Sequence, residues 1–229
     1  MFSGIMRAVR IKEANMEPNA APAVREHHVH QRHFDRLVML ADGVFAIALT
    51  LSAVELRPEA KPGQTLLQIW GKPLLAYFLT FFILGVVWFQ HRRTMAQLRR
   101  IDRTLTLITL LLLSLVALMP VVIRTMVSGE SGLDQTVGMT IYALSLVAIN
   151  FSLAMGWGYA AFIGGLAPDV PRPRAWSWLL HDTFIALTWA AIACWFLQRI
   201  WLLALVAVMA VVVRIASARQ SRAARAAQA

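Results

Sequence analysis

Apolar residues are grouped along the chain into six continuous stretches separated by short polar segments. They cover about residues 37–56, 74–90, 105–123, 137–159, 183–197 and 200–215, with Thr65 as an alternative start for the second. About 20 helical residues cross a hydrocarbon core of about 30 Å, and three of the stretches have this length without their flanks. The runs are unbroken rather than alternating, so they favour helices over strands. We therefore predict an all-α membrane protein with six transmembrane helices.

The composition supports the same class. The 229 residues are 59% hydrophobic and 15% charged, whereas soluble domains are about 45–50% apolar and about 25% charged. A soluble fold of this size has too little interior to bury so much apolar surface. The single cysteine, Cys194, excludes a disulfide framework and a cysteine-rich metal site, and we expect it to be a small apolar packing residue.

The net charge of +10 is explained by topology. If the six stretches cross in alternation, 17 of the 22 Lys and Arg residues lie on the side shared by both termini. Such an excess marks the cytoplasmic side. We therefore expect a multi-pass protein of the cell membrane with both termini cytoplasmic and no nucleic-acid partner. The expected parts are a polar tail (1–34), a six-helix transmembrane domain (35–216) and a basic C-terminal tail (217–229). The tryptophans near span ends are expected to be interface anchors: Trp70, Trp157, Trp176, Trp178 and Trp201.

Asp42 lies inside the first apolar stretch, where a carboxylate is costly and usually faces a bundle interior or water. The residues one turn away are Val38 and Ala46, so the same helix offers no cation within one turn. Asp42 must pair with another helix, with water or with a proton. We favour a structural bond between helices, and a direct ion or proton site is the alternative.

The same stretch carries Ile47, Thr50 and Val54 on one helical face, with Leu51 beside it. By itself this pattern is most typical of helix packing. An apolar stripe can also line a narrow pore that closes by dewetting, with the Thr50 hydroxyl in reach of a passing cation. Periodicity leaves both interpretations open.

A candidate polar cluster lies near the cytoplasmic end of the bundle. His91 follows the second stretch and Asp102 precedes the third, near the same membrane face as Arg36 and Asp42. The alternative is that His91 and the neighbouring arginines are interfacial residues that mark topology.

Three further motifs are weaker. Residues 136–139 resemble the start of a carbonyl selectivity filter but lack its tyrosine and second glycine, so we expect Gly138 to be a packing residue. His181 and Asp182 are expected to form a helix N-cap with an interfacial histidine rather than a catalytic dyad. Four tail histidines are expected to be solvated or interfacial, with modulation by protons or a divalent metal as the alternative: His27, His28, His30 and His33.

The first stretch resembles the first helix of the transmembrane protein 175 type potassium channels of endolysosomes and prokaryotes. Their signature is Arg-x-x-x-Phe-Ser-Asp followed by a Val-Phe-Ala-Ile-Ala-x-Thr-Leu type run. Leu40 and Ala41 replace the Phe and Ser, and the matching residues are Arg36, Asp42, Gly43, Val44, Phe45, Ala46, Ile47, Ala48, Thr50 and Leu51. The pair Trp88 and His91, then Asp102 and the leucine run to Pro120, resemble the second and third helices. The resemblance covers residues 36–120.

This resemblance implies a tetramer of six-span units whose first helices line a central pore. The family has no carbonyl filter, and rings of apolar side chains with a threonine ring form the constriction. Carried over, these rings are Ile47, Thr50 and Val54. A polar network would hold the pore helix, and its members would be Arg36, Asp42, Trp88, His91 and Asp102. The missing serine before Asp42 removes one hydroxyl from that network.

We therefore expect a tetrameric cation channel that is selective or weakly selective for K⁺ and has no cofactor and no resident metal. Its expected partners are K⁺, membrane lipids and further copies of the chain. The alternative is a secondary transporter that couples protons or cations through Asp42, but the sequence has no convincing internal repeat. A membrane enzyme using His91 with Asp102, or the tail histidines with a metal, is disfavoured. The chain has none of the GxxxxGK[ST], GxSxG or HExxH motifs.

Overall fold

Helices account for the regular structure of the described residues. The computed structural model describes residues 20–56, 58, 62–127 and 135–226, with side chains from 33 to 220 within these ranges. The described residues contain no strand, which confirms the all-α prediction. The helices are α2 (Ala20–Val54), α3 (Leu66–Met95), α4 (Arg103–Ala117), α5 (Met119–Val127), α6 (Gln135–Gly158), the π-helical turn η2 (Tyr159–Ile163), α7 (Arg172–Phe196) and α8 (Ile200–Ala226).

Six helical segments of the described chain are long and apolar enough to cross a membrane, as predicted. They are His33–Val54, Leu66–Met95, Arg103–Val127, Gln135–Ile163, Arg172–Phe196 and Ile200–Gln220. The third combines α4 and α5, which meet at Leu118 just before Pro120. Proline has no N–H to donate, so it interrupts the helical hydrogen bonding at this point.

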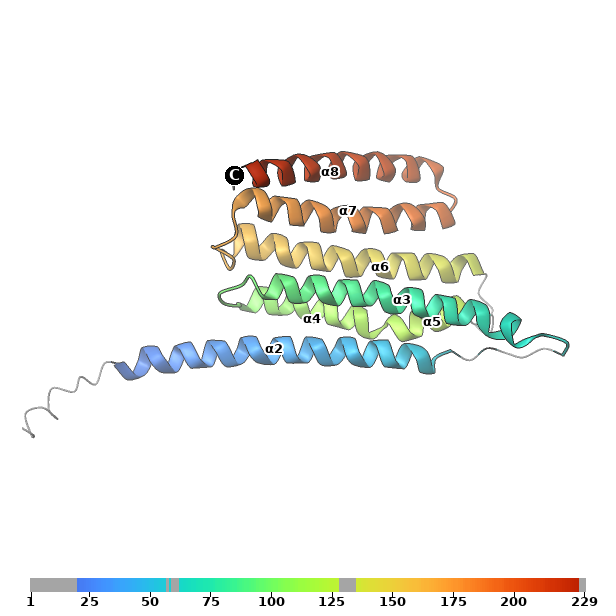
Figure 1. The fold of residues 1–229 in the computed structure, drawn as a ribbon, viewed down its shortest axis with the longest axis horizontal. Coiled ribbons are helices and arrows are strands. Elements are labelled where there is room, and N and C mark those ends of the chain that lie inside the picture. Colours follow the sequence, from blue (N-terminus) through green and yellow to red (C-terminus); the bar gives the residue numbers. More distant parts are fainter. Residues whose placement is uncertain (1–19, 57, 59–61, 128–134, 227–229) are drawn as a thin grey trace, which may run out of the picture.

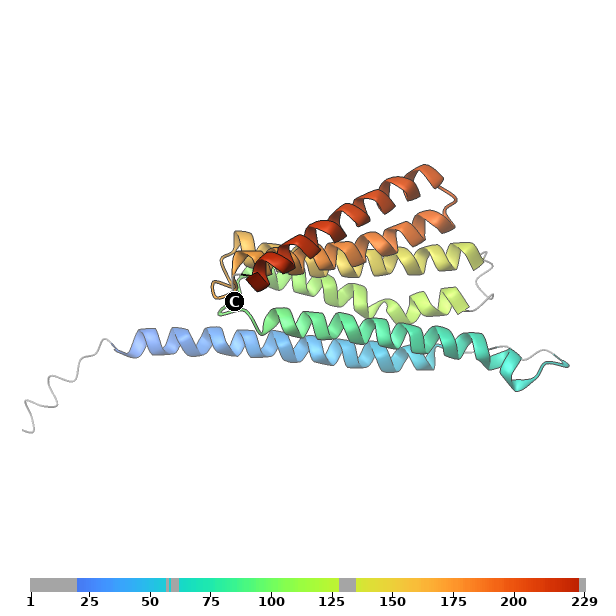
Figure 2. The same ribbon diagram turned by 45° about the horizontal axis from the view of Figure 1, so that its top comes forward.

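The helices lie side by side, with α2 at one edge of the molecule and α8 at the other (Figure 1). On one side of the molecule α2 packs against α3, α4 and α5, while α6 joins these helices to α7, and α8 packs on α7. Figure 2 shows α8 inclined away from α2 at the periphery. The main core lies between α2 and the helices from α3 to α6, and Phe45, Leu84, Val116 and Leu146 are among its most deeply buried members.

Several helix ends differ from the sequence-based expectation. The first helix begins at Ala20 rather than near residue 37, and α7 begins at Arg172 rather than near residue 183. His181 and Asp182 therefore lie inside α7, and the predicted N-cap is wrong because Pro171 occupies that position. The last two spans are joined by a tight turn between Phe196 and Ile200, with Gln198 at a positive φ of 55°.

Gly138 marks a close approach between α5 and α6. A Cβ atom on this glycine would lie 2.7 Å from the carbonyl oxygen of Thr125, closer than real Cβ contacts. Residues 136–139 belong to α6 from its first turn. The packing role expected for Gly138 is thus confirmed.

The tryptophans divide into two groups. Trp201 is 89% exposed and Trp176 is 44% exposed, which suits residues at a membrane interface. Trp157 is fully buried, and its Nε1 donates a hydrogen bond to the carbonyl oxygen of Ala175 at 2.9 Å. The prediction of an interface anchor is wrong for Trp157, because its side chain points into the bundle rather than towards lipid.

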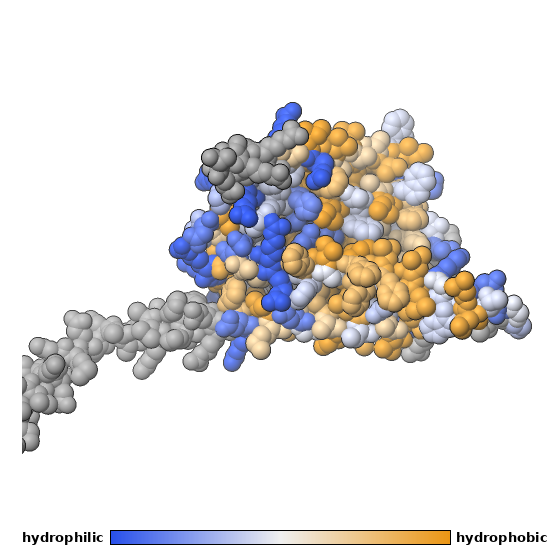
Figure 3. All heavy atoms as spheres, viewed as in Figure 1, coloured by the Kyte–Doolittle hydropathy of each residue, from blue (hydrophilic) through white to orange (hydrophobic). Residues whose placement is uncertain are grey.

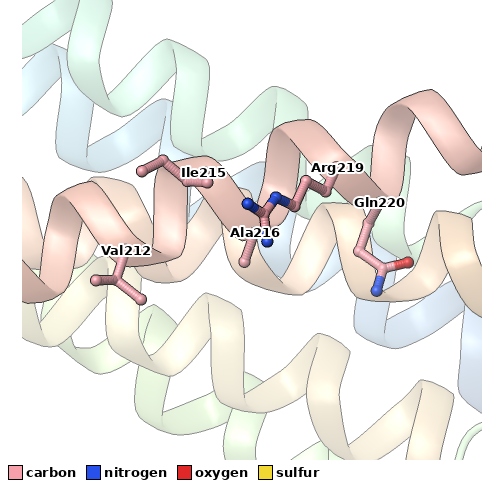
Figure 4. Close-up of a pocket in the computed structure, with 5 residues that line it drawn as sticks. All are labelled: Val212, Ile215, Ala216, Arg219 and Gln220. Atoms are coloured by element: carbon pink, nitrogen blue, oxygen red, sulfur yellow. The ribbon is translucent and has the colours of Figure 1, made fainter.

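Apolar residues cover much of the surface on the face shown in Figure 3. On the face shown in Figure 3, hydrophilic residues gather towards the end where α3 and α6 finish and α7 begins. A hollow of about 360 Å³ lies on α8 (Figure 4), lined by Val212, Ile215, Ala216, Arg219 and Gln220. All of its described lining residues belong to one helix, so among the described residues it has no opposing wall.

Candidate functional site

The first helix, α2, has two different faces. Ala41, Phe45 and Ala48 are at most 2% exposed and pack into the main core. The opposite face is exposed over several turns, and its members include Leu40, Gly43, Ile47, Thr50, Leu51 and Val54. We call Ile47, Thr50, Leu51 and Val54 the α2 stripe. One face of α2 is thus anchored, while the stripe is uncovered by other described parts of the chain.

The α2 stripe combines large apolar groups with one hydroxyl. Ile47 is 59% exposed, Leu51 47% and Val54 62%. Thr50 Oγ1 lies 3.0 Å from the carbonyl oxygens of both Ala46 and Ile47 and donates its hydrogen to the helix backbone. Because the proton is directed inward, the oxygen lone pairs remain available on the exposed side as acceptors for a cation.

Asp42 is bound to the neighbouring helix. Trp88 of α3 donates a hydrogen bond from Nε1 to Asp42 Oδ1 at 2.7 Å. Both side chains are partly buried, and the bond joins residues 46 positions apart in sequence. The partner that an intramembrane carboxylate requires is therefore the indole N–H of α3, which links α2 to α3 beside the α2 stripe.

His91 lies one turn after Trp88 and is 3% exposed. Its ring centroid is 6.2 Å from that of Phe45, and its Nε2 is buried without a hydrogen-bond partner among the described residues. The guanidinium of Arg92 lies over the Trp88 ring, 5.2 Å from the centroid. Arg36 is exposed and makes no hydrogen bond or ion pair with the described residues.

Asp102 takes part in a different set of contacts from Asp42. It caps the N-terminus of α4, where Oδ1 accepts a hydrogen bond from the Leu105 backbone N–H at 2.8 Å. Its other oxygen, Oδ2, accepts a short hydrogen bond from the hydroxyl of Tyr159 in η2. The side-chain bonds of Asp102 thus join α4 to the end of α6. Sequence reasoning missed the contact with Tyr159. The capping role of Asp102 did have a signal in the sequence, because an aspartate directly before a helix is a recognisable N-cap residue.

A second link joins the segment between α3 and α4 to the segment between η2 and α7. Arg99 donates from Nε and Nη2 to the two carboxylate oxygens of Asp169, at 2.6 and 2.5 Å, and its backbone N–H donates to the Leu166 carbonyl oxygen at 3.0 Å. The hydrogen bonds and negative charge of Asp169 raise the pKa of Arg99. Together with the bond between Asp102 and Tyr159, these contacts form what we call the loop clasp.

The far end of α2 is also held. Glu55 Oε2 lies 3.6 Å from Arg124 Nη1 of α5, in an ion pair that sequence reasoning did not identify. The available signal was an acid at the end of the first span and a base at the end of the third, which alternating topology places at the same membrane face. The α2 helix is therefore fixed to its neighbours near both ends of the α2 stripe.

The histidine cluster of the tail is only partly visible. The side chains of His27, His28 and His30 lie outside the described residues, and His33 is exposed. Among the described side chains, no group of three or more His, Cys, Asp or Glu residues is arranged to hold a metal ion.

Comparison with known proteins adds an independent finding. The model of the family described as endosomal/lysosomal potassium channel TMEM175 matches residues 36–120. A potassium channel of Streptomyces collinus is 30% identical over 147 residues, which cover 61% of this chain and 71% of the relative. A potassium channel of Chamaesiphon minutus is 30% identical over 138 residues, covering 57% and 68%. The mouse endosomal/lysosomal proton channel TMEM175 is 24% identical over 155 residues, covering 63% of this chain and 30% of the relative. No solved structure matches significantly.

Proposed function

Since the chain belongs to the TMEM175 family of channels, we propose that it is a potassium-conducting channel whose pore is lined by α2. The observation that supports this pore assignment is the division of α2 into a face packed in the core and the exposed α2 stripe. The family is named for ion conduction rather than catalysis, so the activity proposed is passive permeation of a cation.

The proposed pore is shared between copies of the chain. Phe45 and the other inward residues of α2 fill the core of one six-helix unit, so a pore through that unit would require a gap in its packing. Rotational symmetry instead brings the same stripe from each copy around one axis. We propose four copies, following the family resemblance, with both termini cytoplasmic according to the charge distribution.

The α2 stripe has the chemistry of a hydrophobic gate. Rings of Ile47 and Val54 would exclude water at a narrow diameter, because a constriction lined by apolar groups empties readily. Between them the Thr50 oxygen would offer an acceptor to an ion that has lost part of its hydration. The hydrogen bond between Trp88 and Asp42 would fix the rotation of α2, which decides which residues face the axis.

The test is potassium flux into liposomes containing the purified protein. Ile47→Asn replaces the apolar ring with a polar one and should raise K⁺ flux at least several-fold over the unsubstituted protein. Val208→Asn is the matched control, because Val208 lies on the peripheral α8 and is 62% exposed against 59% for Ile47. Equal fluxes for Ile47→Asn and the unsubstituted protein would refute the pore assignment.

The copy number has a separate test. The mass of the purified protein in detergent, after subtraction of bound detergent and lipid, should be four times the 25.5 kDa of one chain. A monomer that retains channel activity would overturn the shared pore.

A further inference from the structure

A group of arginines lies on aromatic rings where α3, α7 and α8 meet. The guanidinium carbon of Arg93 is 3.7 Å from the centroid of the Trp178 ring, and that of Arg174 is 5.3 Å from the same centroid. Arg214 of α8 lies over the Phe184 ring of α7 at 5.5 Å. All three arginines are exposed. We call Arg93, Arg174 and Arg214 the arginine cluster.

The aromatic ring beneath Arg93 and Arg174 is packed against a buried tryptophan. Trp178 packs against Trp157, with ring centroids 5.1 Å apart. Trp157 is fully buried and is fixed by its hydrogen bond to the carbonyl oxygen of Ala175. Arg93 and Arg174 therefore stack on a ring that is itself held by the core.

Within the described part of the chain, the guanidinium groups of the arginine cluster use none of their hydrogen-bond donors. None of its three guanidinium groups donates a hydrogen bond to, or forms an ion pair within 4.0 Å of, any described group. A guanidinium that stacks through its face keeps its in-plane N–H donors free, and their fork matches the oxygens of a phosphate. The guanidinium N–H groups are therefore held in place by the aromatic rings and have no acceptor among the described residues.

The local charge is positive. His181 is within electrostatic range of both Arg93 and Arg214, so the members of the cluster belong to one charged region. The acid that interacts with Arg93 is Asp182, which is 7% exposed and therefore faces inward. The groups that these interactions connect are thus the three arginines, His181 and the inward-facing Asp182.

The position along the helices points to a lipid. Arg93 follows the second apolar stretch by three residues, Arg214 lies at the end of the sixth, and Trp178 precedes the fifth. Trp176, which is 44% exposed, and Trp178 are aromatic residues of the kind that mark the headgroup level of a bilayer. The arginine cluster consequently lies where phospholipid phosphates are, beside apolar helix surface that acyl chains would cover.

We propose that the arginine cluster binds the phosphate headgroup of an anionic membrane phospholipid. Basic pockets between transmembrane helices recognise such headgroups. A lipid in this position would bridge α3 to α7 and α8, and so connect the helix that holds Asp42 with the peripheral pair. This proposal is independent of ion conduction.

The test uses the purified full-length protein in detergent micelles doped with phosphatidylglycerol or with zwitterionic phosphatidylcholine. Phosphatidylglycerol should raise the thermal unfolding midpoint more than phosphatidylcholine at the same mole fraction. In Arg93→Gln/Arg174→Gln, the phosphatidylglycerol concentration for half of this shift should rise about 25-fold, taking about fivefold for each arginine. The double variant Arg100→Gln/Arg219→Gln is the control, since it removes two exposed charges outside the cluster.

Each other outcome has a defined meaning. Equal losses in the two double variants would refute the site and indicate general attraction to charge. No difference between the two lipids, or an equal shift with inorganic phosphate, would refute an anionic-lipid site. If the double variant does not fold, Arg214→Gln on the exposed side of α8 provides the same comparison, with an expected change of about fivefold.

Discussion

Replacing Trp88 with phenylalanine isolates the bond that holds α2. The substitution removes the N–H that donates to Asp42 Oδ1 at 2.7 Å and keeps an aromatic ring in the core. Interhelical hydrogen bonds in membranes are worth about 0.6 kcal/mol on average. A charged acceptor roughly doubles the strength of such a bond, and loss of the donor leaves a partly buried carboxylate unpaired. We therefore expect a loss of about 1.5 kcal/mol in the free energy of unfolding, a factor of about 13 in the equilibrium constant.

The assay is reversible unfolding in mixed micelles, arranged as a double-mutant cycle with Asp42→Leu. If the two side chains interact as described, the coupling free energy should be about 1.5 kcal/mol. Trp189→Phe is the matched control, since Trp189 is partly buried and packs edge-on against the Tyr142 ring at 6.2 Å. A coupling below about 0.5 kcal/mol, within the range of independent sites, would refute the reasoning.

Further substitutions test other features. Gly138→Ala should lower the free energy of unfolding by about 1–3 kcal/mol, because the added Cβ overpacks the contact with α5. Gly85→Ala is the control and should not lower it, because a Cβ at Gly85 meets nothing within 4 Å. Equal effects of the two substitutions in thermal unfolding would contradict the close approach at Gly138. Asp169→Asn should change the free energy of unfolding little, because the side chains of Arg99 and Asp169 are 67% and 61% exposed, and added salt should shrink the difference further. Asp42→Asn should preserve passive K⁺ flux, measured in liposomes without a proton gradient. If the unsubstituted protein instead takes up a solute only when a proton gradient is applied, and this uptake disappears in Asp42→Asn, the result would favour the alternative of a secondary transporter.

The number and type of the helices were predictable because a bilayer imposes a minimum apolar length. Hydropathy finds the part of each helix that lies in hydrocarbon, but it does not find the helix ends. For this reason α2 begins well before its apolar stretch, and α7 already includes His181 and Asp182. The backbone hydrogen bonds of those extensions form in water as well as in lipid, so the change in polarity does not end the helix.

The contacts of the candidate site were less predictable than its residues. Asp42 could be recognised as needing a partner, and Trp88 and His91 were identified on the neighbouring helix by resemblance. Which faces of two helices meet depends on packing between residues far apart in sequence, so the separate role of Asp102 with Tyr159 required the fold. The buried position of Trp157 had the same cause, because closeness to a span end does not indicate which way a side chain points.

The length of α2 has a mechanical consequence. Its 35 residues form one uninterrupted helix of about 52 Å, which exceeds a hydrocarbon core of about 30 Å by several turns. The projecting part and the α2 stripe consequently belong to one stiff rod, which is fastened to α3 at Asp42 and to α5 just after its end at Glu55. A force applied outside the bilayer would therefore be transmitted along α2 to these two contacts, on either side of Ile47, Thr50 and Val54, without needing to unfold any intervening segment.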